Sequence, residues 1–282
     1  MLNLSAIQTD AFAQHLAGLY RDQFPAPAPD HSDLIQEIAG MALDQIAASD
    51  APYHDAEHTM LVTLVGVEIA RGRLLVEGMG AEDWLHFVVA LLLHDIGYVH
   101  GACSGDTGCT AITGPAGAQV ALPRTATDAF LAPWHVARGQ IFVRERFADH
   151  PVLGAERLAR AIGFTRFPVP SEAAFQETES EPALLRAADF IGQLADPARE
   201  RKIEALFREL TETGLAPTLG YGSVDDIRAD CGDFFRQDIA PWIGHAATCL
   251  GRTAEGRQWL DSLYTQLSRA ADAPSPSSRL AS

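Results

Sequence analysis

The stretch FVVALLLHDIG, residues 87–97, runs seven apolar residues directly into a histidine and an aspartate. Seven consecutive apolar side chains belong in a core, so the pair His94 and Asp95, which follows without a turn, is expected to be at least partly buried. Burying a carboxylate without compensation costs several kcal/mol, and a metal cation is its strongest available partner. The alternative is an ordinary helix end, with His94 near the last carbonyls and Gly97 as the cap.

The segment YHDAEH, residues 53–58, contributes two histidines four positions apart, His54 and His58. If this segment starts a helix, the two side chains lie on one helical face and can reach a single site. Two surface histidines beside acidic neighbours would give the same pattern. The pair therefore gains meaning only in combination with other candidate ligands.

The segment LLRAADFIGQL, residues 184–194, places Asp189 in an otherwise apolar helix. Like Asp95, this carboxylate needs a buried partner, which is either a metal ion or an arginine such as Arg186. The three segments together offer imidazole and carboxylate ligands from separate helices, as in the metal sites of helical bundles. These donors suit Zn, Mn, Fe or Mg, and a set without thiolates leaves positions for water, as hydrolysis requires.

Apolar residues recur with helical spacing along most of the chain, and alternating strand patterns are nearly absent. We therefore expect an all-α, single-domain helical bundle over residues 1–272. The glycine-rich segment 101–123 has neither period and is expected to form a long loop, and residues 273–282 are expected to be a disordered tail. The predicted helical stretches are 33–48, 57–77, 81–94, 151–162, 181–195, 199–213 and 253–269.

Charge and cysteine content restrict the partners. The chain has 37 acidic residues against 21 basic ones, a formal net charge of −16, which argues against binding duplex nucleic acid. An anionic substrate would then depend on bound metal for its attraction. Four cysteines without a C-x-x-C pair indicate free thiols in a reducing compartment. Because we find neither a secretory signal nor an apolar run of membrane length, we expect a cytoplasmic protein without a membrane partner.

The order H…HD…D across a helical chain resembles the HD phosphohydrolase superfamily, and the closer likeness is to the cyclic-nucleotide phosphodiesterases. YHDAEH at 53–58 is similar to their Y-H-N-x-x-H, and ALLLHDIG at 90–97 resembles their helix ending in H-D. RAADFIGQLADP at 186–197 looks like their C-A-D-L-x-x-P region with a small insertion. FFRQDIAPW at 234–242 resembles the segment that walls their nucleotide pocket, and RTAEGRQW at 252–259 is similar to their closing N-R-x-W segment.

This resemblance implies a fold of the HD phosphodiesterase type and a metal-dependent phosphohydrolase that cuts a small, nucleotide-like phosphoester with a metal-activated hydroxide. It implies two divalent ions, Zn, Mn, Mg or Fe, with Asp95 as a catalytic ligand that bridges them. His54 would be the general acid that protonates the leaving oxygen. The other implied roles are metal ligation by His58, His94, Asp189 and, near the second ion, His135, and substrate binding by Tyr53, Phe234 and Trp242, with Phe234 stacking on a base.

Two positions depart from the phosphodiesterase pattern. Asp55 stands where those enzymes have the Asn of Y-H-N, and Cys231 stands where they place a purine-reading glutamine, three residues before the stacking Phe234. Cysteine cannot make a bidentate amide contact to a base edge. The resemblance therefore supports the class of reaction more strongly than a cyclic-nucleotide substrate.

Two other functions fit the same ligands. HD proteins with additional histidine ligands can hold two irons and act as oxygenases, which here would require His135 and a further histidine such as His100 or His150. A non-catalytic HD module that binds a nucleotide for regulation is the other alternative, and the intact ligand set together with His54 argues against it. His100 also resembles, less clearly, a further family histidine. The pattern leaves the substrate, the metal and the oligomeric state open.

Overall fold

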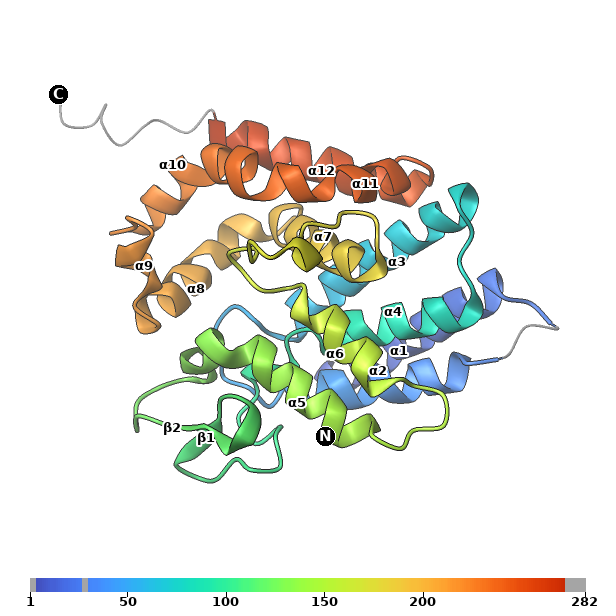
Figure 1. Ribbon diagram of the computed structural model, residues 1–282. Coiled ribbons are helices and arrows are strands. Elements are labelled where there is room, and N and C mark those ends of the chain that lie inside the picture. The colour runs from blue at the N-terminus through green and yellow to red at the C-terminus, as the bar shows by residue number, and fades with distance from the viewer. Residues whose placement is uncertain (1–3, 27–29, 272–282) are drawn as a thin grey trace.

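Helices dominate the computed structural model, which describes residues 4–26 and 30–271 (Figure 1). All seven predicted helical stretches are helices, although the fourth begins at Ala155 rather than at Pro151. The predicted tail, 273–282, lies outside the described residues. The α-helices are α1 (Leu4–Gln23), α2 (Ser32–Ile46), α3 (Ala56–Val76), α4 (Ala81–Leu93), α5 (His135–Phe147), α6 (Ala155–Gly163), α7 (Glu181–Leu194), α8 (Arg199–Glu212), α9 (Leu215–Thr218), α10 (Val224–Phe234), α11 (Ala240–Leu250) and α12 (Ala254–Ala271).

These helices form one mostly helical domain, as expected from the spacing of apolar residues. The prediction did not include α1, α5, α9, α10 and α11, which the structure adds. Within the described residues, no helix combines the length and the apolar composition that a membrane span needs. The predicted fold class is therefore confirmed at the level of a helical domain.

The centre of the molecule is formed by α3, α4 and α7. Every residue of α4 from Trp84 to Leu93 is buried, as predicted for the apolar run. The axes of α3 and α7 approach closely at Gly192, where a Cβ atom would lie 3.1 Å from the Cα atom of Val62. A glycine at this position lets the two helices bring their polar residues to the same point inside the core.

A second close approach joins the end of α4 to α5. A short 3₁₀ turn, η1 (Ile96–Tyr98), follows His94 and Asp95. A Cβ atom on Gly97 would lie 1.8 Å from the carbonyl oxygen of His135, so only glycine allows this contact. Gly97 does not have the positive φ of a left-handed helix cap, and the alternative of an ordinary glycine cap is therefore wrong.

The glycine-rich segment 101–123 is largely irregular, as predicted, but contains a short antiparallel hairpin of β1 (Thr110–Ile112) and β2 (Gln119–Ala121). The segment is held by two buried, charged side chains, Arg138 and Asp106, which we call the loop hub. The Arg138 guanidinium donates to both Asp106 carboxylate oxygens, at 2.9 and 3.0 Å. It also donates to the carbonyl oxygens of Gly97, Val99 and Ile112, at 2.6 to 2.8 Å. The loop is therefore fastened to the turn that follows Asp95.

Candidate metal centre

Four predicted ligands converge where α3, α4 and α7 meet. His58 lies in the first turn of α3, His94 and Asp95 directly follow α4, and Asp189 lies in α7. We call these four residues the ligand cluster. Potential ligand atoms of His58, His94 and Asp189 lie within 4.8 Å of one another, and the same holds for His54, His58 and Asp95. The structure thus brings together four of the five residues predicted to bind metal.

The ligand cluster is compact and buried. Oδ2 of Asp95 lies 3.3 Å from Nε2 of His58 and 3.1 Å from Nε2 of His94. Oδ1 of Asp189 lies 3.6 Å from the first of these nitrogens and 3.8 Å from the second. His58, His94 and Asp95 are all at most 5% exposed.

Local hydrogen bonds position His58 and orient the His94 side chain of the ligand cluster. The carboxylate of Asp55 caps α3 by accepting from the backbone N–H of His58 at 2.8 Å, which gives this residue a structural role. The Nδ1 atom of His94 lies 2.8 Å from the carbonyl oxygen of Leu91. Because a carbonyl only accepts, Nδ1 carries the proton, and the Nε2 lone pair of a neutral His94 points into the cluster.

Three atoms of the cluster lack hydrogen-bond partners. Among the described residues, the buried atoms without a partner include Nε2 of His58, Nε2 of His94 and Oδ2 of Asp95. Burial alone would lower the pKa of His58, but the nearby carboxylates of Asp189 and Asp95 outweigh it and raise the pKa to about 10. The two carboxylates therefore create a strong demand for positive charge at this point.

His135 lies on the other side of the Asp95 carboxylate. Its Nε2 atom is 3.9 Å from Oδ1 of Asp95, whereas His58 and His94 contact Oδ2. Its Nδ1 atom lies 2.6 Å from the carbonyl oxygen of Ala132 and therefore carries the proton. Burial lowers the pKa of His135, which favours a neutral ring with its Nε2 lone pair free. The Asp95 carboxylate thus lies between two groups of potential ligands, as a bridging role requires.

His54 lies beside the ligand cluster and has a partner that the sequence did not reveal. Its Nδ1 atom is 2.6 Å from Oε2 of Glu209, in α8. The other carboxylate oxygen of Glu209 accepts from the backbone N–H groups of Tyr53 and His54, at 2.6 and 3.1 Å. Burial lowers the pKa of His54, but the charge and hydrogen bond of Glu209 outweigh it, so the net pKa is raised. Glu209 thus holds one nitrogen of this imidazole and places a proton on it.

Tyr98 is a further residue that the sequence did not single out. Its ring stacks on His54, with centroids 4.3 Å apart and planes 11° apart. Its other face stacks on His135, at 4.5 Å and 24°. Burial, followed by the charges of Asp95 and Glu209, raises the pKa of Tyr98 well above its usual value, so the phenol stays neutral.

Other candidates have partners elsewhere. The guanidinium of Arg186 donates to the carbonyl oxygens of Phe175 and Glu177, both at 2.7 Å, so the proposed salt bridge from Arg186 to Asp189 is wrong. His100 Nε2 lies 2.7 Å from the carbonyl oxygen of Thr107. His150 Nδ1 accepts from the backbone N–H groups of Val152 and Leu153, at 3.2 and 2.9 Å.

The predicted substrate-binding residues divide into two groups. Tyr53 is buried beside the metal-ligand candidates, with its ring centroid 5.4 Å from that of His58. Phe234 packs edge-to-face on Phe167, at 5.6 Å, and the Trp242 ring lies 4.4 Å below the Arg186 guanidinium carbon. Phe234 lies in α10 and Trp242 in α11, and binding of a base beside either ring stays a prediction. Cys231, in α10, is buried.

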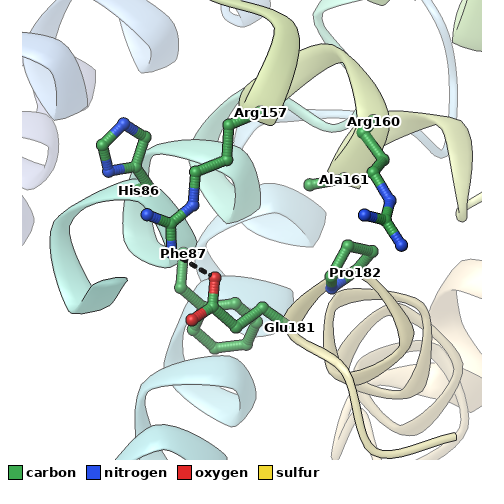
Figure 2. Close-up of a pocket in the computed structure, with 7 residues that line it drawn as sticks. All are labelled: His86, Phe87, Arg157, Arg160, Ala161, Glu181 and Pro182. Atoms are coloured by element: carbon green, nitrogen blue, oxygen red, sulfur yellow. Dashed lines mark hydrogen bonds and ion pairs between the residues drawn. The ribbon is translucent and has the colours of Figure 1, made fainter. Parts of the chain in front are cut away.

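A surface pocket between α4, α6 and α7 is separate from the ligand cluster (Figure 2). Arg157 donates to Glu181 across it at 2.5 Å (Figure 2) and to Asp83 at 2.7 Å. His86, at its edge, has its Nδ1 atom 2.8 Å from the Glu82 carbonyl oxygen, and its Nε2 atom accepts from a backbone N–H group. Arg157, Glu181 and His86 therefore already have polar partners.

A family model described as Npun_R2479-like matches residues 2–272 of the chain. The comparison with curated proteins finds no match. The family description states no activity, so the function has to be argued from the chemistry of the site.

Proposed function

The chain belongs to the Npun_R2479-like family, and we propose that it is a metal-dependent phosphohydrolase of the HD type. Two divalent ions would be held by His58, His94, Asp95, Asp189 and His135, with Asp95 between them. The substrate would be a small, nucleotide-like phosphoester that is cut at a phosphorus–oxygen bond.

The observation that carries this proposal is the set of unpartnered atoms in the ligand cluster. A buried polar atom without a partner costs about 1–3 kcal/mol, and three such atoms, from His58, His94 and Asp95, meet at one point. A divalent cation accepts nitrogen and oxygen ligands together and would satisfy all three. The high pKa of His58 has the same origin, since a proton there meets the demand that a cation would otherwise meet.

Ions held by these residues would supply Lewis acidity, which lowers the pKa of water and neutralises charge on the phosphoryl oxygens. The role of the chain itself is then to hold the ligands and to move a proton. With Nδ1 of His54 held by Glu209, its Nε2 atom is the one that can deliver a proton to the leaving oxygen. The negative charge of Glu209 favours the protonated ring that this step needs.

The contacts of the remaining histidines support hydrolysis over the diiron oxygenase. That alternative needs His135 and a further histidine, but His100 and His150 engage backbone groups of the loops that contain them. A purely regulatory nucleotide-binding module would not need a proton donor with a buried carboxylate partner, which His54 has in Glu209. Phosphoester hydrolysis uses both the ligand cluster and the pair of His54 and Glu209.

Metal analysis of the wild-type protein and of Asp95→Ala tests the proposal. Wild-type protein is expected to contain divalent metal and to hydrolyse some of a panel of cyclic and linear nucleotides and bis(p-nitrophenyl) phosphate. Asp95→Ala should lose both metal and turnover, because its carboxylate contacts both groups of ligands. Asp44→Ala, at an exposed carboxylate of α2, is the control. Full metal content and normal turnover in Asp95→Ala would remove the central claim.

His54→Ala separates the proton donor from the ligands. Because His54 acts through its proton rather than by holding metal, this variant should keep its metal and lose turnover by roughly 10²–10⁴-fold, the usual contribution of general acid catalysis. Elemental analysis and initial rates on the same preparation give the comparison. If metal is lost in parallel with activity, His54 is a ligand and the assignment of the acid fails.

A further inference from the structure

We propose that Tyr98 is a positioning residue that holds His54 and His135 in a single stack, so that the proton donor and the second-ion ligand keep a fixed relation. The inference rests on the proposed function of the same site. Nothing in the sequence pattern marks Tyr98, which follows the HDIG segment as one more large side chain.

The stack consists of three rings from three parts of the chain. His54 precedes α3, Tyr98 lies in η1 and His135 starts α5. The tyrosine ring lies 4.3 Å from one imidazole and 4.5 Å from the other, both nearly parallel to it. With a ring on each face, Tyr98 can tilt only if an imidazole moves with it.

Each imidazole has one strong hydrogen bond and needs a second contact to fix its orientation. A single hydrogen bond at Nδ1, from His54 to Glu209 and from His135 to the Ala132 carbonyl, still lets the ring swing about that bond. Contact with the tyrosine face removes this freedom and sets the direction of Nε2. For His54, Nε2 is the atom that delivers the proton, and for His135 it is the atom that faces Asp95. The same phenol ring therefore aims both functional nitrogens.

The ring, rather than the hydroxyl, carries this role. The Tyr98 oxygen lies 3.5 Å from Nε2 of His54, a distance at which a hydrogen bond contributes little. The ring, in contrast, stacks on both imidazoles, and the close approach at Gly97 holds η1 against α5. Tyr98→Phe should therefore preserve function, and Tyr98→Leu should not.

The experiment compares Tyr98→Phe, Tyr98→Leu and Phe142→Leu in the full chain. Phe142 is a buried aromatic on α5, the helix of His135, and controls for the loss of a ring from the core. Mn²⁺ titrated into metal-free protein measures the two binding steps without turnover. Rates with bis(p-nitrophenyl) phosphate, whose leaving group needs no proton, are compared with rates for a cyclic nucleotide that releases a ribose alkoxide.

Tyr98→Leu is expected to weaken the second Mn²⁺ by about 10–100-fold, as loss of an outer partner of a metal ligand does, and to leave the first unchanged. Its rate with the cyclic nucleotide should fall at least about tenfold further than its rate with the activated ester. Tyr98→Phe should stay within about threefold of wild type in both measurements. If Tyr98→Leu behaves like Phe142→Leu, or if Tyr98→Phe matches Tyr98→Leu, the positioning role is wrong.

The Mn²⁺ titration tests this inference separately from the proposed function. If wild-type protein binds two ions yet hydrolyses neither ester, phosphohydrolysis fails as a function. The Mn²⁺ titration then still decides whether Tyr98 aims His135, because that measurement needs no turnover. An unchanged second binding step in Tyr98→Leu overturns the inference even when both esters are hydrolysed.

Discussion

Two buried groups of charged side chains flank the turn after α4, and they differ in one respect. In the loop hub, the guanidinium of Arg138 has an acceptor for each of its donors, and both oxygens of Asp106 are bound. In the ligand cluster, buried atoms of His58, His94 and Asp95 point at one another without hydrogen bonds. Both groups are buried and charged, but only the Arg138 and Asp106 side chains of the loop hub have all their hydrogen-bond partners.

The difference separates a structural role from a functional one. A buried charged side chain whose donors and acceptors are all occupied has no free atom for a ligand. Its substitution lowers the stability of the fold. A buried charge with an incomplete set is unfavourable in isolation, and a protein that keeps such a set gains from the ligand that completes it. Variants of the loop hub should therefore change stability, and variants of the ligand cluster should change metal binding.

Arg138→Met gives the largest expected change in stability. The substitution leaves the Asp106 carboxylate buried without its counter-charge, which costs about 3–5 kcal/mol in comparable buried pairs. Urea unfolding measures the loss. Arg144→Met on the same helix is the matched control, because Arg144 makes an exposed pair with Glu156 and should change stability by less than about 1 kcal/mol.

Metal binding by the same variant sharpens the comparison. The first ion depends on α3, α4 and α7 rather than on the loop, so folded Arg138→Met should still bind it. Equal stability of Arg138→Met and Arg144→Met would show that the loop hub contributes nothing and would break the distinction.

The predictable part of the site lies where a polar residue interrupts an apolar run. Asp95 and Asp189 stand out in this way, and the expectation that they are drawn together agrees with the structure, where both carboxylates lie beside Nε2 of His58. Glu209 does not stand out in this way. In RERKIEALFREL, residues 199–210, it is one of several charged residues spaced as on a solvent-exposed helix face. Only packing of α8 against Tyr53 and His54 buries it.

The helix α5 was missed for a related reason. Its sequence, HVARGQIFVRERF, places Arg138 and a glycine at buried positions, which interrupts the apolar stripe that marks a helix. The arginine is buried because it binds Asp106 and Ile112 of the glycine-rich segment, both more than twenty-five residues away in sequence. Tyr98 likewise resembles an ordinary core residue until both of its faces are seen to be covered by imidazoles.

Metal removal is expected to have the next largest effect. An ion that binds only the folded state stabilises it by about 2.7 kcal/mol at a free concentration of 100 times Kd. For a chain of this size that corresponds to a fall of about 5–10 °C in Tm when the metal is removed with EDTA. Asp95→Ala should show no such shift, and Arg138→Met should keep it. Identical Tm values for wild-type protein in EDTA and in excess metal would mean that the ligand cluster is as complete as the loop hub.

The smallest expected effect concerns His86, a buried histidine whose two ring nitrogens both have partners. Burial lowers the pKa of His86, so at mildly acidic pH the unfolded chain takes up a proton at this position before the folded protein does. Stability from this group is therefore complete above the unfolded pKa of about 6.5 and is lost as the pH falls below it. One proton limits the slope to about 1.4 kcal/mol per pH unit.

His86→Gln isolates this contribution, because a glutamine amide can donate to the Glu82 carbonyl and accept from the Gly154 N–H group without titrating. The difference in unfolding free energy between wild type and His86→Gln, measured in urea from pH 8 to pH 5 in EDTA, should shift in favour of the variant as the pH falls. Titration of the ligand cluster affects both proteins alike and cancels in the difference. A difference that stays constant with pH would show that His86 becomes charged in the folded protein, and complete partners would then not suffice to identify a purely structural histidine.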